Sequence, residues 1–144
     1  MSAGSSGRIL HIDDERSVRD SMALLLRMEG YETYGAGSGL EALDCVSRGF
    51  QPDVLIVDFN LDPQLNGAEA VERIGRVLKY APPTIMLTGN IDGAKVPRIV
   101  EVVVWMTRKP LNPQRLLAAL PGLVQLSRGT RAASLRCDMG TGAP

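Results

Sequence analysis

The sequence predicts an α/β fold in which a doubly wound, five-stranded parallel sheet carries helices on both faces. Two observations support this fold class. Short apolar or β-prone runs alternate five times with longer stretches of helical periodicity along the chain. Several of the short runs are apolar at almost every position, which is typical of strands buried on both faces of a parallel sheet.

The expected strands and helices follow from this periodicity. Apolar or β-prone runs predict strands at residues 8–12, 31–35, 54–57, 84–87 and 102–106. Apolar residues that recur every three or four positions predict helices at residues 17–28, 38–46, 67–78, 91–100 and 113–124. Each of the five units therefore has a strand followed by a helix.

Residues with strong boundary preferences mark the ends of several helices. Gly30 is a suitable stop for the first helix, and Ser38 with Glu41 predicts a capping box at the start of the second. The helix at residues 91–100 is the weakest of the five, because a glycine and a proline interrupt it. Pro113 is suited to the first turn of the last helix.

The connections between strands restrict the topology. Crossovers between parallel strands are right-handed, and five strands favour the order 2-1-3-4-5 of flavodoxin-like folds. In that order the first and third strands are neighbours. Binding sites in such sheets lie at the carboxyl ends of the strands, so we expect the functional residues at that edge.

Composition narrows the classes of function. The chain has 144 residues with 16 basic and 16 acidic side chains, so its charge gives no reason to expect direct binding to nucleic acid or to an anionic membrane. No apolar run reaches the roughly 18 residues that span a bilayer. Cys45 and Cys137 form neither a metal motif nor a disulfide framework, so we expect free thiols and a cytoplasmic location.

The chain divides into one domain and two short ends. We expect a flexible leader at residues 1–7 and a single compact domain at residues 8–126. Residues 127–144 are rich in glycine, serine and arginine without clear periodicity, and they are predicted to form a loose tail. This tail is too short for a DNA-binding or catalytic module.

Polar residues follow four of the five expected strands. Asp13 and Asp14 end the first strand, Asp58 the third, Thr88 the fourth, and Lys109 follows the fifth. Three carboxylates held close together are unfavourable unless a cation lies among them, and hard oxygen ligands suit Mg²⁺. A lysine and a hydroxyl beside them would hold a phosphoryl group next to a carboxylate nucleophile. The pattern favours phosphoryl transfer to an aspartate.

Five short motifs occur in the order and at nearly the spacing of a known family. They are IDDE at 12–15, VDFNL at 57–61, the glycine at 67, LTG at 87–89 and RKPL at 108–111. Together they resemble the receiver domain of the response regulators of two-component signalling, over roughly residues 8 to 126. The resemblance is specific because it depends on all five motifs together.

This resemblance implies a role for each residue at the sheet edge. Asp58 would be the phosphoacceptor, Thr88 the switch hydroxyl, and Lys109 the partner of the phosphoryl group. The implied Mg²⁺ ligands are Asp58, Asp14, Asp13 through a water molecule, and the backbone carbonyl of Asn60. The domain would then take a phosphoryl group from a phosphohistidine donor, catalyse its own phosphorylation and dephosphorylation, and switch conformation.

The resemblance also implies partners. A sensor histidine kinase or a histidine phosphotransfer protein would supply the phosphoryl group. A homodimer is a further prediction, through the face that the expected helix 91–100, the strand 102–106 and the last helix would form. The stretch before that strand, residues 99–104, is unusually apolar and is a candidate partner surface.

Two departures from the family pattern qualify this interpretation. Proline usually stands four residues after the phosphoacceptor, but here that position is Asp62 and the proline is Pro63. The longer segment is more typical of receivers attached to hybrid sensor kinases. The aromatic switch residue is replaced by Met106, with Trp105 one position earlier and directed to the other face of the strand. Coupling between Thr88 and an aromatic side chain is therefore not expected in its usual form.

Three other functions use parts of the same pattern. A haloacid-dehalogenase phosphatase needs a second aspartate two residues after the first, where this chain has Glu15 and Arg16 following Asp14. A flavodoxin-like cofactor binder needs a phosphate loop after the first strand, where two aspartates would repel phosphate. A pseudo-receiver that only binds partners stays open as the alternative, although the five site residues are all present.

Overall fold

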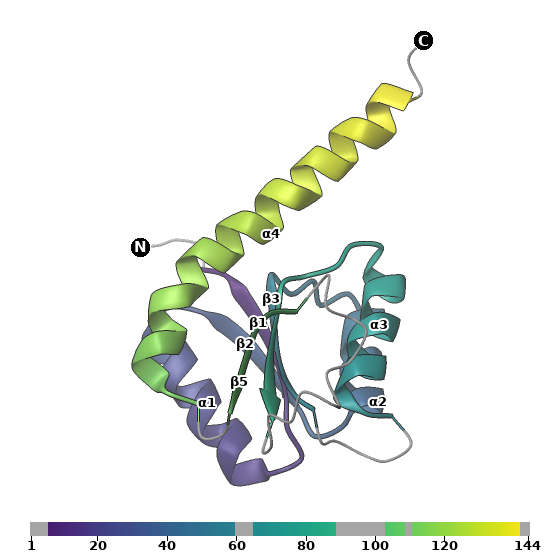
Figure 1. Cartoon of the computed structure of the whole chain (residues 1–144). Coiled ribbons are helices and arrows are strands. Elements are labelled where there is room, and N and C mark those ends of the chain that lie inside the picture. The colour runs from purple at the N-terminus through teal and green to yellow at the C-terminus, as the bar shows by residue number, and fades with distance from the viewer. Residues whose placement is uncertain (1–5, 60–64, 89–102, 109–110, 142–144) are drawn as a thin grey trace.

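The computed structural model describes residues 6–59, 65–88, 103–108 and 111–141, and for residues 103–106, 108 and 132–141 it describes the backbone alone (Figure 1). In this part of the chain the strands are β1 (Arg8–Ile12), β2 (Glu32–Ala36), β3 (Val54–Asp58), β4 (Thr84–Thr88) and β5 (Val103–Arg108). The helices are α1 (Arg16–Met28), α2 (Gly39–Ser47), α3 (Gly67–Leu78) and α4 (Pro113–Thr141). The helix expected at residues 91–100 lies outside the described residues.

The five strands form one parallel sheet in the order β2-β1-β3-β4-β5, which confirms the predicted fold class and topology. Strand β1 pairs with both β2 and β3, and Ile12 lies opposite Val57 in the register. On the other side of β3, Asp58 lies opposite Leu87 of β4. The carboxyl ends of β1, β3 and β4 therefore lie side by side.

Helices cover both faces of the sheet, and each face has its own apolar core. Figure 1 shows α2 and α3 on one side of the sheet, with α1 and α4 on the other. Side chains alternate between the two faces: Leu55 and Val57 of β3 belong to the core under α2 and α3, whereas Val54 and Ile56 belong to the core under α1 and α4. This explains why the strand reads as a continuous apolar run.

Side-chain caps fix the starts of two helices. Ser38 caps α2 as predicted, its hydroxyl accepting from the backbone N–H of Glu41 at 3.1 Å. The Glu41 carboxylate, however, accepts from the backbone of Gly37 rather than Ser38, so the predicted capping box is only half formed. A complete capping box occurs at α3, between Asn66 and Glu69.

Two further expectations concern the state of the cysteines and the presence of membrane-spanning helices. Cys45 is a buried free thiol on α2, and its burial raises the pKa of that thiol. Within the described ranges, none of the helices combines the length and the apolar character needed to cross a bilayer.

The two ends of the domain differ from the prediction. Ser6 and Gly7 were expected in a flexible leader, but the Ser6 N–H donates to the carbonyl of Gly30 at 2.9 Å, and the Gly7 carbonyl accepts from Glu32 at 2.9 Å. The prediction of a loose tail from residue 127 is also wrong for residues 127–141, which continue α4 as a helix. The arginines of this segment make long-range contacts, described below, that the sequence pattern does not indicate.

Candidate functional site

Three aspartates meet at the carboxyl edge of the sheet. Asp58 is the last residue of β3, and Asp13 and Asp14 directly follow β1. One carboxylate oxygen of each residue lies within 4.8 Å of those of the other two. Because β1 and β3 are neighbours, the strand order alone brings these residues together, as the sequence predicted.

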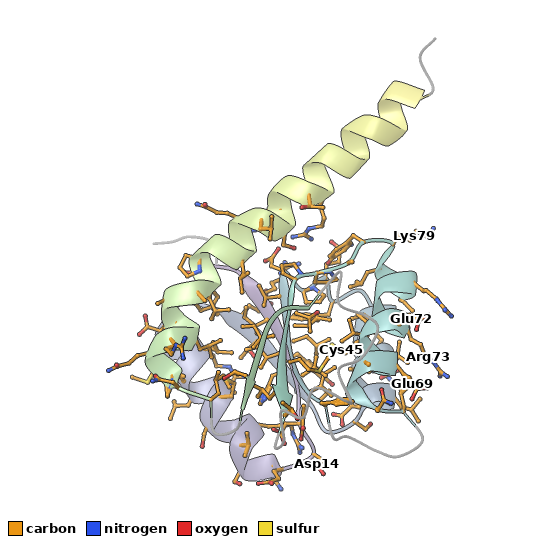
Figure 2. The ribbon with its side chains drawn as sticks, viewed as in Figure 1. Asp14, Cys45, Glu69, Glu72, Arg73 and Lys79 are labelled. Carbon is orange, nitrogen blue, oxygen red and sulfur yellow. The ribbon has the colours of Figure 1, made fainter. Side chains whose placement is uncertain are left out.

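The three carboxylates differ in their access to water. The side chains of Asp13 and Asp58 are buried, with residue exposures of 0% and 2%, whereas Asp14 is exposed. Figure 2 places Asp14 at the end of the domain that lies away from the projecting part of α4. Negative charges held this close repel one another in a partly desolvated site. The site is therefore electrostatically suited to a cation.

Backbone contacts fix the position of Asp13. Its Oδ1 accepts from the backbone N–H of Glu15 at 2.9 Å, and its own N–H donates to the carbonyl of Ala36 at 3.0 Å. The Arg19 guanidinium donates to the Asp13 carbonyl at 2.7 Å. Sequence reasoning missed Arg19, because an arginine in the first turns of an amphipathic helix resembles any solvated residue.

Gly67 packs the start of α3 directly against the end of β3. A Cβ at this position would lie 2.6 Å from the carbonyl oxygen of Asp58 and 2.9 Å from Cα of Phe59. The Gly67 N–H donates to the carbonyl of Phe59 at 3.2 Å. The family motif contains this glycine, and the structure supplies the physical reason: any side chain would push helix and strand apart at the aspartate.

The other predicted site residues are placed only in part. Thr88 ends β4 one residue beyond Leu87, which faces Asp58, and its side chain is buried. Lys109 and Asn60 lie outside the described residues, and so do the side chains of Trp105 and Met106. The expected dimer face includes residues 91–102, which also lie outside the description.

The donor set fits Mg²⁺. Carboxylate oxygens are the hard ligands that this ion prefers, and ligands on an octahedral ion at about 2.1 Å lie roughly 3 to 4 Å apart. The oxygens of Asp13, Asp14 and Asp58 lie within 4.8 Å of one another, so small side-chain rotations would bring them to one ion. Asp14 is exposed, so water can reach this carboxylate of the cluster.

A pocket of about 720 Å³ opens beside the aspartates. It lies between α1 and the start of α4, and apart from Asp13 and Glu15 its lining is uncharged and mostly apolar. The contributing side chains include Val18, Met22 and Leu25 of α1, with Leu111 and Pro113 from the opposite side. Asp13 thus lies where an acidic cluster borders an apolar groove.

The fold and this edge of the sheet define a class of protein. Residues 9–121 match the family model of the response regulator receiver domain. The chain belongs to this family, whose members act in two-component signalling, as the five motifs predicted.

Similar proteins agree with this assignment. The DNA-binding response regulator MtrA of Mycolicibacterium paratuberculosis is 33% identical over 120 residues, covering 77% of this chain and 48% of MtrA. A CheY-like receiver domain from Methanospirillum hungatei has a TM-score of 0.74 at 25% identity, over 86% of this chain and 98% of that one. Chemotaxis protein CheY4 of Vibrio cholerae has a TM-score of 0.69 at 30% identity, over 84% and 99%. This chain spans about half the length of the curated relatives it matches.

Proposed function

We propose that this receiver domain takes a phosphoryl group onto Asp58 from a phosphohistidine donor, in a reaction that requires Mg²⁺. The main support for this proposal is the cluster of Asp13, Asp14 and Asp58 at adjacent strand ends. Membership of the receiver family supports the same function. The aspartyl phosphate would then bias the domain between two conformations.

The phosphoryl transfer requires few covalent steps from the protein. A carboxylate oxygen of Asp58 attacks the phosphorus, and a P–O bond forms as the P–N bond to the donor imidazole breaks. The electron pair of that bond stays on the imidazole nitrogen, which takes a proton from solvent. Backbone contacts hold Asp13 and Gly67 keeps the end of β3 in place, so the nucleophile is positioned before the donor arrives.

Charge is the main obstacle, because a dianionic phosphoryl group must approach three carboxylates. A bound Mg²⁺ supplies the compensating positive charge. Asp14, Asp58, the Asn60 carbonyl and, through water, Asp13 are the proposed ligands. Thr88, at the end of the neighbouring strand, is proposed to donate its hydroxyl to a phosphoryl oxygen, and Lys109 to pair with another. Aspartyl-phosphate hydrolysis at the same site would reset the domain.

The proposed donor is a sensor histidine kinase or a histidine phosphotransfer protein. The apolar groove between α1 and the start of α4 adjoins Asp13, so a donor helix seated there would bring its histidine to the site. Val18, Leu25 and Leu111 line this groove. The exposed Leu24 and Met28 extend the apolar surface along α1.

The direct test is to incubate the protein with Mg²⁺ and acetyl phosphate and to measure its intact mass. We expect a gain of one phosphoryl group that is lost with EDTA and absent from Asp58→Asn. Asp44→Asn, which changes an exposed aspartate of α2, is the matched control and should be phosphorylated like the wild type.

Other outcomes have definite meanings. If the wild-type protein gains no mass under any condition, the chain acts as a pseudo-receiver that binds partners without phosphorylation. If Asp58→Asn still gains mass, the phosphoacceptor is a different residue and the assignment of the site is wrong.

A further inference from the structure

The last helix continues well past the core of the domain. Val124 is the last residue of α4 in the apolar core, yet the helix extends to Thr141 and projects away from the sheet (Figure 1). We call residues 127–141 the arm. The arm contains Gly129, Thr130 and Gly140, which are weak helix formers, and isolated helices of about 12–15 residues are marginal in water. Local propensity therefore does not explain why the arm is helical.

A buried carboxylate from the opposite end of the sheet contacts the first turns of the arm. Asp53, which directly precedes β3, has a residue exposure of only 2%. Its oxygens accept from Nε and Nη2 of Arg128 at 3.4 and 3.3 Å, and from Nη2 of Arg131. The backbone N–H of Arg8 donates to the same carboxylate at 2.9 Å. We call Asp53, Arg128 and Arg131 the clamp.

Tyr80 adds a second contact to the clamp. Nη1 of Arg131 donates to the Tyr80 hydroxyl at 3.4 Å, and the Arg131 guanidinium carbon lies 4.7 Å from the centroid of the tyrosine ring. The same hydroxyl donates to the carbonyl of Pro52 at 2.8 Å. Arg131 is thus held by a carboxylate, a hydroxyl and an aromatic face, all from the chain segments that flank β3 and α3.

The clamp links the charge of Asp53 to the conformation of the arm. A buried carboxylate is unfavourable unless cations and hydrogen-bond donors compensate it. Arg128 and Arg131 are three residues apart, and a helical turn presents both guanidinium groups on one face. If the arm unfolded at this point, Asp53 would lose the two cations that compensate its charge.

We propose that the clamp is a conformational device that sets the state of the arm. When Asp53 holds both arginines, the arm is helical and leaves the domain in one direction. When the clamp opens, the arm loses its helical structure while the sheet stays folded. The clamp lies at the start of the strand whose other end carries Asp58, so one buried strand joins the candidate phosphoacceptor to the arm. This proposal does not depend on phosphorylation.

Hydrogen–deuterium exchange of the full chain, followed by mass spectrometry of its peptides, tests the proposal. The variants are Asp53→Asn, which keeps an acceptor for Arg8 but removes the charge, and the double variant Arg128→Gln with Arg131→Gln. In both we expect peptides from residues 127–141 to exchange at least tenfold faster than in the wild type. Peptides from β1 and β3 should be accelerated less, by about fivefold at most, and should stay strongly protected. Arg73→Ala, which removes an exposed arginine of α3, should leave the arm unchanged.

The exchange rates of the sheet peptides distinguish this device from a general loss of stability. Acceleration that is greater in the arm than in the sheet in either variant supports the proposal, and it remains decisive if the other variant does not fold. Equal acceleration in the arm and the sheet would mean that the clamp only stabilises the domain as a whole. Unchanged protection of the arm in both variants would show that it is helical for another reason. Either of these results overturns the proposal.

Discussion

The two aspartates at the ends of strand β3 are equally buried but have opposite surroundings. Asp53, before the strand, and Asp58, at its end, each have an exposure of 2%. Two guanidinium groups and a backbone N–H surround Asp53. Asp58 instead lies within 4.8 Å of the carboxylate oxygens of Asp13 and Asp14. The comparison shows that the burial of a carboxylate does not by itself identify a functional site.

The two ends differ in the charge of the described side chains around each carboxylate. At Asp53 the chain supplies the cations, so the carboxylate joins distant segments and its contribution is structural. At Asp58 the described neighbours include the carboxylates of Asp13 and Asp14, so a cation from solution would relieve their repulsion. A buried carboxylate beside two like charges is a place where a cationic ligand and its chemistry can enter.

The largest expected contrast is between Asp53→Asn and Asp58→Asn, which should change the free energy of unfolding in opposite directions. In EDTA, Asp53→Asn should lower the free energy of unfolding by about 1 kcal/mol, because the amide loses the charge-assisted hydrogen bonds from two arginines that are themselves partly exposed. Asp58→Asn should raise the free energy of unfolding by about 1 kcal/mol or less, because it removes one of three like charges. Urea denaturation measures both values. Equal losses in the two variants would mean that the two aspartates play the same structural part.

Addition of Mg²⁺ tests the difference between the two ends of β3 further, because only the acidic cluster should bind the ion. At a concentration 100 times its dissociation constant, a ligand that binds only the folded state stabilises it by about 2.7 kcal/mol. We expect this gain in the wild type and in Asp44→Asn, and little or none in Asp14→Asn, which removes an exposed carboxylate of the cluster. Thermal unfolding with and without Mg²⁺ measures it. A full gain in Asp14→Asn would place the ion elsewhere.

The difference between the two ends also explains what the sequence could predict. Asp13, Asp14 and Asp58 each follow a recognisable apolar strand, and the strand order then places them at one edge. Periodicity and topology were therefore sufficient for the acidic cluster. The roles of Lys109 and Asn60 rest on the family motifs and stay predictions.

No sequence pattern of this kind indicated the clamp. Arg128 and Arg131 are 75 and 78 residues away from Asp53, and arginines among glycine, serine and threonine resemble a solvated tail. In our proposal the helix at residues 127–141 depends on that long-range pairing, whereas the local composition there predicts a tail. Arg19 was missed for a similar reason, because its contact is with a backbone carbonyl.

Gly67→Ala tests the packing at the Asp58 end. The new methyl group would lie 2.6 Å from the Asp58 carbonyl, so helix α3 and strand β3 must separate. We expect a loss of about 2 kcal/mol in the free energy of unfolding and slower phosphorylation by acetyl phosphate. Gly75→Ala in the same helix is the matched control, because its nearest neighbour would be the Tyr80 carbonyl at 3.7 Å. That change should be neutral or slightly stabilising. Equal effects of the two changes would show that close packing at Asp58 is unimportant.

Tyr80→Phe should change the free energy of unfolding less than Gly67→Ala does. It tests one contact at the Asp53 end of β3. It removes the hydroxyl between Arg131 and the Pro52 carbonyl but keeps the ring, so the free energy of unfolding should fall by about 1 kcal/mol near neutral pH. Urea denaturation between pH 7 and 11 measures this difference.

The pH dependence of that difference identifies the hydroxyl. Burial raises the pKa of Tyr80 above its ordinary value of 10.0, outweighing the opposite effect of Arg131. Above pH 10 the unfolded chain loses this proton before the folded chain does, so the wild type loses a contribution to stability that the phenylalanine variant never had. The gap between the two proteins should therefore narrow as the pH rises above 10, whereas the similar shift at Tyr31 is common to both and cancels. A gap that stays constant through this range would assign the loss to altered ring packing, and the clamp would then depend on its charges alone.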